Sequence, residues 1–62
     1  MPLVHIELLE GRSDEKKLAM IRRVTEAMAE SLEIEAEEVD IIVREVRRKD
    51  WATGGVTWDR QG

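Results

Sequence analysis

Residues 1–13 read MPLVHIELLEGRS, a short apolar stretch that starts at a proline and ends at Gly-Arg-Ser. Val4, Ile6 and Leu8 recur at every second position, which is the side-chain period of a β-strand. The positions between them are also partly apolar, so the stretch predicts a strand with two faces that need cover. Gly11 then permits a tight exit from the strand.

A helix is expected to follow this strand. Ser13 is a typical helix N-cap, and Asp14 and Glu15 fall in the first turn, where the helix dipole favours negative charge. Further along the chain, apolar side chains recur at spacings of three or four residues, at Leu18, Ile21, Val24, Met28 and Leu32. This pattern predicts an amphipathic helix that begins at about Asp14, buries one face and fades after Leu32.

Residues 39–46, VDIIVREV, are rich in β-branched side chains and predict a second strand. A strand, a helix and a strand of these lengths form a βαβ unit, in which the two strands are parallel. Gly54 and Gly55 suit a turn, after which residues 56–58 are expected to pair as a short strand or hairpin against a neighbouring subunit. The predicted fold class is therefore α/β, a single βαβ unit plus a short C-terminal hairpin.

One helix covers only one face of such a sheet, whereas parallel strands are normally buried on both faces. The chain of 62 residues is expected to form one domain, residues 1–62, and a domain of this size buries only about 60% of its unfolded surface. It has no cysteine for a disulfide. Other copies of the chain are therefore expected to complete the sheet by dimerisation and to cover its second face.

The composition excludes several classes of function. With no cysteine and a single histidine, His5, the chain offers no set of ligands for a zinc site, and no cofactor is predicted. Ten basic and 14 acidic residues give a net charge of −4, which disfavours binding to nucleic acid. Neither a membrane span nor a signal peptide is recognisable, so we expect a soluble, cytoplasmic protein without a membrane partner.

The amino-terminal proline is a candidate general base. Because Pro2 is small, we expect Met1 to be trimmed during synthesis, which leaves a free secondary amine on Pro2. A free α-amino group titrates at about 7.7 to 8.0, and apolar neighbours such as Leu3 and Trp51 would lower that value toward neutral pH, where general bases work best. The alternative is an ordinary proline at a strand edge, where the missing N–H costs nothing.

Several features resemble the 4-oxalocrotonate tautomerase family over nearly the whole chain. They are Pro2 at the start of an apolar strand, LLEGRSDE at residues 8–15, the helix, the second strand and WATGG at residues 51–55. The resemblance implies an isomerase that converts the enol and keto forms of a 2-hydroxy-2-alkenoate or a similar carboxylate without a cofactor, with Pro2 as the base. It also implies a trimer of dimers, a homohexamer, whose sites lie at subunit boundaries.

Arg12 and Trp51 are the candidate substrate-binding residues. The guanidinium of Arg12 can hold a carboxylate through two charge-assisted hydrogen bonds, and the start of the helix adds a field that favours an anion. The alternative for Arg12 is a surface ion pair with Glu10 or Glu15. By the resemblance, Trp51 occupies the position of the aromatic residue that walls the apolar pocket around the catalytic proline; its alternative is packing at an interface.

Asp40 departs from the family, whose best-known members carry an arginine at this position that binds the substrate. A carboxylate would instead repel a diacid. Three interpretations stay open: Asp40 is structural and paired with Arg44 or with an arginine of another chain; it lies in the site and alters substrate choice; or it activates water. The third would make the protein a lyase similar to the hydratase and dehalogenase relatives of the superfamily. A further alternative is a non-catalytic subunit of a hetero-oligomer.

Overall fold

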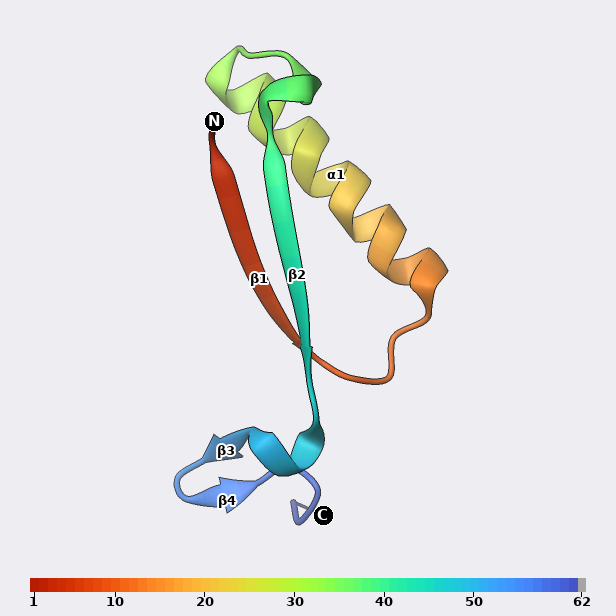
Figure 1. Cartoon of the computed structure of the whole chain (residues 1–62), viewed down its shortest axis with the longest axis vertical. Helices are drawn as coiled ribbons and strands as arrows, with labels where there is room; N and C mark the ends of the chain where they lie inside the picture. Colours follow the sequence, from red (N-terminus) through yellow and green to blue (C-terminus); the bar gives the residue numbers. More distant parts are fainter. Residues whose placement is uncertain (62) are drawn as a thin grey trace.

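The computed structural model describes residues 1–61, and Figure 1 shows how its elements are arranged. Strand β1 (Leu3–Leu9) leads into helix α1 (Asp14–Leu32), and a one-turn 3-10 helix, η1 (Ala36–Glu38), connects α1 to strand β2 (Asp40–Val46). The two strands lie side by side, α1 runs along one face of them, and the amino terminus lies beside the start of β2 (Figure 1). The predicted α/β fold is therefore confirmed.

The strands are parallel and in register from the pair Leu3–Asp40 at one end to the pair Leu9–Val46 at the other. β2 begins one residue later than predicted, because the backbone N–H of Val39 donates to the carbonyl of Ala36 (3.0 Å) and closes η1 instead. The register decides which side chains of the two strands are neighbours, and strand periodicity alone does not contain this information.

Alternation along the strands gives the sheet two unlike faces. The half-buried face toward α1 carries the pairs Val4–Ile41 and Ile6–Val43. The other face is exposed and carries the pairs Leu3–Asp40, His5–Ile42 and Glu7–Arg44. We call it the open face.

Helix α1 begins directly after Ser13, the N-cap that the sequence predicts. The Ser13 side chain accepts a hydrogen bond of 3.2 Å from the backbone N–H of Lys16, which satisfies one of the free donors of the first turn. At the other end, Glu33 takes a left-handed backbone conformation (φ 56°), and the next N–H, that of Ile34, donates to the carbonyl of Ala29 (3.0 Å). Local chemistry thus sets both ends of the helix.

After β2 the chain forms a second 3-10 turn, η2 (Arg48–Asp50), and the antiparallel strands β3 (Ala52–Thr53) and β4 (Val56–Thr57). Gly54 and Gly55 join these strands with φ of 62° and 82°, a region that glycine enters without strain. The predicted hairpin is confirmed, and it pairs within the chain. Its contact with a neighbouring subunit stays a prediction.

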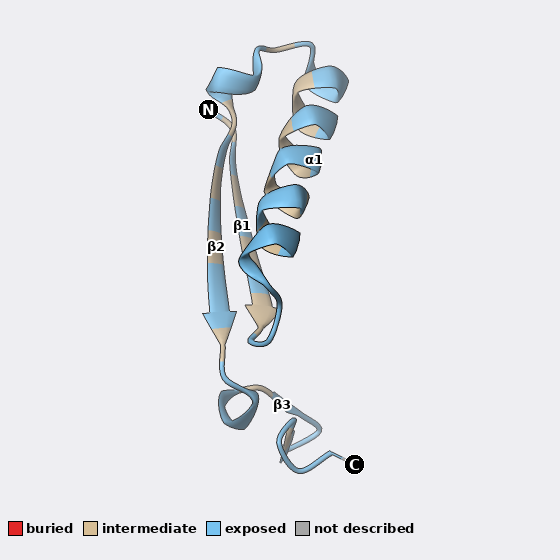
Figure 2. Ribbon diagram, turned by 90° about the vertical axis from the view of Figure 1, so that its right-hand side faces the viewer, coloured by how far each residue is buried: buried red, intermediate tan, exposed pale blue. Residues whose placement is uncertain are grey.

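The single chain has almost no interior (Figure 2). None of residues 1–61 is fully buried, and Leu3 and Ile42 on the open face are 57% and 51% exposed. The radius of gyration is 14.6 Å, whereas a compact domain of this length would have about 11 Å. A chain this thin leaves the open face uncovered, as the sequence predicts. Over the described residues, no helix has both the length and the apolar character that crossing a bilayer requires.

Candidate active site

Pro2 lies directly before β1, at the end of the sheet where β2 starts. Its carbonyl accepts a hydrogen bond of 2.9 Å from the backbone N–H of Asp40. The ammonium group of Met1 donates to the carbonyl of Glu38 at 2.9 Å and lies 3.9 Å from the Asp40 carboxylate. Asp40 is therefore the charged side chain next to the amino terminus of its own chain.

Arg12 lies in the loop that joins β1 to α1, at the opposite end of the strand, and is exposed. From Leu3 to Leu9, β1 alone spans about 20 Å, six rises of roughly 3.3 Å, so one chain cannot bring Arg12 to its own Pro2. Within residues 1–61, no ion pair joins Arg12 to Glu10 or Glu15, which leaves its guanidinium unengaged in that part of the chain.

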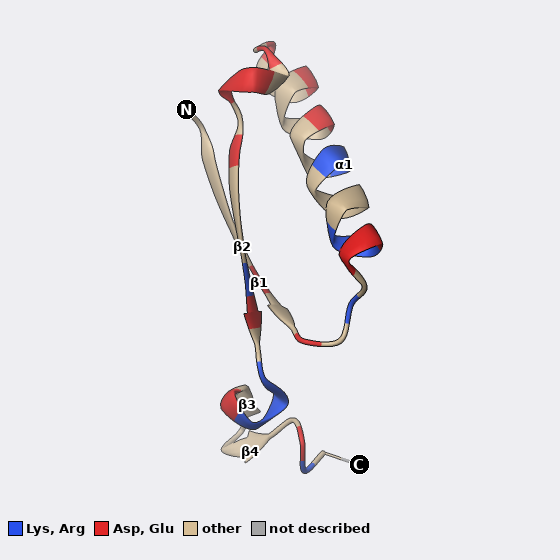
Figure 3. Ribbon diagram, turned by 45° about the vertical axis from the view of Figure 1, so that its right-hand side comes forward, with Lys and Arg blue, Asp and Glu red and all other residues tan. Residues whose placement is uncertain are grey.

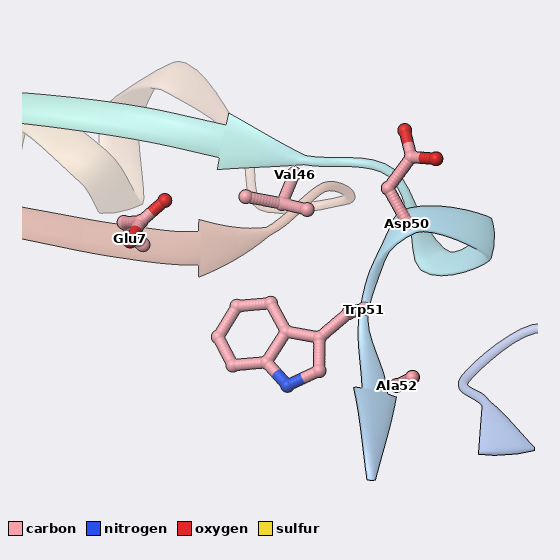
Figure 4. Close-up of a pocket in the computed structure, with 5 residues that line it drawn as sticks. All are labelled: Glu7, Val46, Asp50, Trp51 and Ala52. Atoms are coloured by element: carbon pink, nitrogen blue, oxygen red, sulfur yellow. The ribbon is translucent and has the colours of Figure 1, made fainter. Parts of the chain in front are cut away.

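Trp51 lies just after η2, beyond the carboxyl end of β2. It borders an open hollow of about 280 Å³, whose other lining residues are Glu7, Val46, Asp50 and Ala52. Figure 4 shows the indole of Trp51 turned back toward Glu7 and Val46. The ring also meets Trp58 edge to face, with 6.5 Å between the ring centres. Within one chain, Trp51 is therefore far from Pro2 and at the end of the sheet where Arg12 lies.

Ion pairs border this hollow. Arg44 lies 3.9 Å from Glu7, its neighbour in register on β1, and Arg47 lies 2.8 Å from Asp50. Arg44 thus pairs with Glu7 within the chain, and not with Asp40. Neither Glu7 nor Asp50 is a candidate site residue from the sequence; the two-residue period of β1 puts Glu7 on the open face, but only the register shows that Arg44 is opposite it.

Charge is unevenly distributed along the molecule (Figure 3). Residues 24–43 contain seven acidic and no basic side chains, and they form the end of the molecule that holds the amino terminus. Residues 44–49 contain four basic side chains and one acidic side chain, at and beyond the end of β2. The end with Pro2 is therefore acidic, whereas the end with Arg44 and η2 is rich in basic residues.

Metal-ligating side chains do not cluster in the part of the chain that the structure describes. In the stretch from residue 1 to residue 61, no three histidine, aspartate or glutamate side chains gather closely enough to hold an ion. His5 lies on the open face beside Ile42, and nothing in its surroundings assigns it a role.

The chain also matches a known protein family. The family model described as "Tautomerase enzyme" matches residues 2–60. The chain belongs to the tautomerase family. The match begins at Pro2 and includes Arg12, Asp40 and Trp51, and the chain is an isomerase.

Individual relatives of this tautomerase agree. The 2-hydroxymuconate tautomerase of Pseudomonas putida is 44% identical over 55 residues, which are 89% of this chain and 87% of the relative. A crystal structure of a 4-oxalocrotonate tautomerase homologue superimposes with a TM-score of 0.90, at 44% identity over 100% of this chain and 98% of the other. A heterohexamer 4-oxalocrotonate tautomerase from Chloroflexus aurantiacus gives a TM-score of 0.92, at 35% identity and 97% coverage of both chains.

Proposed function

We propose that this tautomerase converts the enol form of a 2-hydroxy-2-alkenoate, or of a similar carboxylate, into a keto form without metal or organic cofactor. Pro2, freed by removal of Met1, is the general base; Arg12 binds the substrate carboxylate and Trp51 walls the pocket. The observation that carries the proposal is the place of Pro2 directly before β1. Met1 before it is 89% exposed, so an aminopeptidase has access to the bond that must be cut.

The chemistry needs one group that accepts and then returns a proton. The free amine of Pro2 takes the proton from the enol hydroxyl, and the oxygen becomes a carbonyl as the double bond shifts. The resulting ammonium gives the proton to a carbon of the conjugated chain, which restores the amine. An amide nitrogen has no basic lone pair, so Pro2 acts only when Met1 is absent.

A complete site takes residues from more than one chain. Pro2 and Arg12 lie at opposite ends of β1, and the strongly acidic end of one molecule is complementary to the end of another that is rich in basic residues. Neighbours in antiparallel orientation would bring Arg12 of one chain to Pro2 of the next and would cover the open face. We propose a homohexamer, a trimer of dimers that share a four-stranded sheet.

Asp40 is proposed to lie in this site and to affect substrate choice. Its place beside Pro2 supports this interpretation, and the pairing of Arg44 with Glu7 disfavours the structural alternative in which Asp40 pairs with Arg44. A carboxylate close to the base disfavours a second carboxylate on the substrate. We therefore expect a substrate with one carboxylate, held by Arg12.

Two alternatives rest on particular observations. The position of Asp40 next to Pro2 would also suit a hydratase or dehalogenase-like lyase, in which Asp40 activates water and Pro2 is the acid. The Chloroflexus aurantiacus relative is a heterohexamer, so this chain could be one subunit of a hetero-oligomer that needs a second chain for activity. The cytoplasm is the compartment that we expect for either reaction.

The deciding experiment is a rate measurement with Met1-trimmed protein, whose processing is checked by intact mass. The two substrates are 2-hydroxymuconate, a diacid enol, and phenylenolpyruvate, a monoacid enol. Ketonisation of either establishes the tautomerase, and a preference for the monoacid places Asp40 in the site. No turnover of either by an intact oligomer would contradict the proposal and favour water addition or a partner subunit.

A further inference from the structure

The amino terminus is where the chain brings its proposed base next to a charged side chain. With Met1 in place, the terminal ammonium lies between the Glu38 carbonyl (2.9 Å) and the Asp40 carboxylate (3.9 Å). Removal of Met1 moves the free amine one residue along, to Pro2, whose carbonyl is held at 2.9 Å by the Asp40 amide. The new ammonium therefore stays in the neighbourhood of Asp40.

Within the chain, the other charged groups around this corner of the molecule do not offset Asp40. The titratable side chains of the surrounding elements are Glu30 and Glu33 at the end of α1, Glu35, Glu37 and Glu38 around η1, Asp40 on β2 and His5 on β1. All but His5 are acidic. The Glu38 carboxylate is already engaged by the Glu35 backbone N–H at 3.1 Å. Among the described residues, Asp40 is the side chain that the terminal ammonium contacts.

A carboxylate beside an amine favours the protonated form of that amine. We propose, building on the function proposed above, that Asp40 is a positioning residue that holds the protonated amine of Pro2. It thereby raises the pH at which Pro2 becomes a base. For scale, two opposite unit charges at the separation of the Met1 ammonium and the Asp40 carboxylate, 3.9 Å, attract each other in water by the equivalent of about 0.7 of a pH unit. The kcat/KM should then rise with pH, and Asp40 should move the midpoint of this rise to higher pH.

The test reads the Pro2 amine directly. Protein labelled with ¹⁵N-proline, trimmed of Met1 and checked by intact mass and native mass, is titrated by NMR, and the Pro2 nitrogen signal is followed against pH. Asp40→Asn removes the charge with little change of shape. Glu37→Gln is the matched control, because Glu37 is an exposed acidic residue at the same end and, among the described residues, no hydrogen bond or ion pair joins it to the amino terminus.

We expect Asp40→Asn to lower the Pro2 titration midpoint by about 0.5 to 1 pH unit and Glu37→Gln by less than about 0.2. The acidic limb of kcat/KM should move by the same amount. A midpoint that Asp40→Asn leaves in place, or that Glu37→Gln moves equally, overturns the inference. Because the NMR midpoint needs no turnover, an unshifted midpoint in an active enzyme contradicts only the role of Asp40. A shifted midpoint in a protein that turns over neither enol supports that role and contradicts the proposed function.

Discussion

Pro2 and Arg12 lie at opposite ends of β1: Pro2 immediately precedes Leu3, and Arg12 follows Leu9 by three residues. The strand between them is about 20 Å long, so the two residues of one chain cannot contact the same small molecule. If both act in catalysis, each site joins at least two chains. The proposed mechanism therefore also predicts that the active protein is an oligomer.

Mixed assemblies should therefore recover activity that neither parent has. A chain that retains Met1 lacks the base, and an Arg12→Ala chain lacks the carboxylate-binding residue. Unfolding the two together and refolding them at equal amounts should restore about a quarter of the wild-type sites, by random assortment around symmetric interfaces. Refolding each parent alone is the control. If the mixture is no more active than its parents, the site does not combine Pro2 of one chain with Arg12 of another.

Arg12→Ala alone should raise KM for the enol by about 10-fold to 100-fold, because a charge-assisted hydrogen bond to a carboxylate contributes about 1.5 to 3 kcal/mol. Steady-state kinetics with a monoacid enol measures this effect. The matched control is Arg23→Ala, which removes an exposed arginine from α1, away from the ends of the sheet. Equal KM values for Arg12→Ala and wild type would show that another group binds the carboxylate.

Asp40→Arg should reverse the substrate preference. With an aspartate beside Pro2, the ratio of kcat/KM for phenylenolpyruvate to that for 2-hydroxymuconate should favour the monoacid. An arginine there attracts the second carboxylate of the diacid, and the ratio should fall by at least about 10-fold. Asp40→Asn should give an intermediate ratio. A ratio that all three proteins share would place the Asp40 side chain outside the substrate pocket.

Ile42→Lys should break the assembly. Ile42 is 51% exposed on the open face of the isolated chain, and a lysine buried there between chains would carry an unpaired charge. Native mass spectrometry should give about 43 kDa for the wild type, six times the 7.2 kDa of the chain, and smaller or unfolded species for the variant. Ala19→Lys, on the exposed side of α1, is the control. A wild-type protein that stays monomeric and folded would contradict the proposed hexamer.

Lys17 predicts how stability responds to alkaline pH. Hydrogen bonding to Glu45 (2.9 Å), and then to Asp14, raises the pKa of Lys17 above its usual 10.5. The folded state therefore binds this proton more tightly than the unfolded chain does. Its contribution to stability is complete below about pH 10.5 and is lost as pH rises through the folded-state pKa.

The measurement compares the Tm of wild type and Lys17→Met at equal protein concentration across this range. We expect Lys17→Met to melt lower at neutral pH and the gap to narrow above about pH 10.5. Lys16→Met, one residue earlier and exposed, is the control. A gap that stays constant with pH would mean that the ion pairs of Lys17 contribute nothing to stability.

Local chemistry allowed much of the fold to be predicted. Ser13 marks the start of α1, the β-branched run of residues 39–46 marks β2, and Gly54-Gly55 marks the hairpin turn, because each acts through its own backbone or its nearest neighbours. The family could also be predicted from the sequence, since its motifs include Pro2 and Arg12. These signals require no knowledge of how distant segments pair.

The candidate site could be predicted only in part from the sequence, because it depends on the register between the strands. The periodicity of β2 put Asp40 and Arg44 on one face, and on that basis a pair between them was one interpretation. The register instead puts Arg44 opposite Glu7 and brings Asp40 to Pro2. A shift of one residue in the pairing of the two strands would move every side chain of the shifted strand to the other face of the sheet. The sequence of either strand alone does not show which pairing forms.

The absence of a buried interior in residues 1–61 has a consequence for how this gene tolerates change. In a symmetric assembly every substitution is repeated in each copy, so one altered codon changes all equivalent contacts at once. A chain that relies on its neighbours for its core has few positions that matter to one copy only. In the proposed assembly, small gains and small losses would both be multiplied, and dilution of the protein would weaken folding and catalysis together.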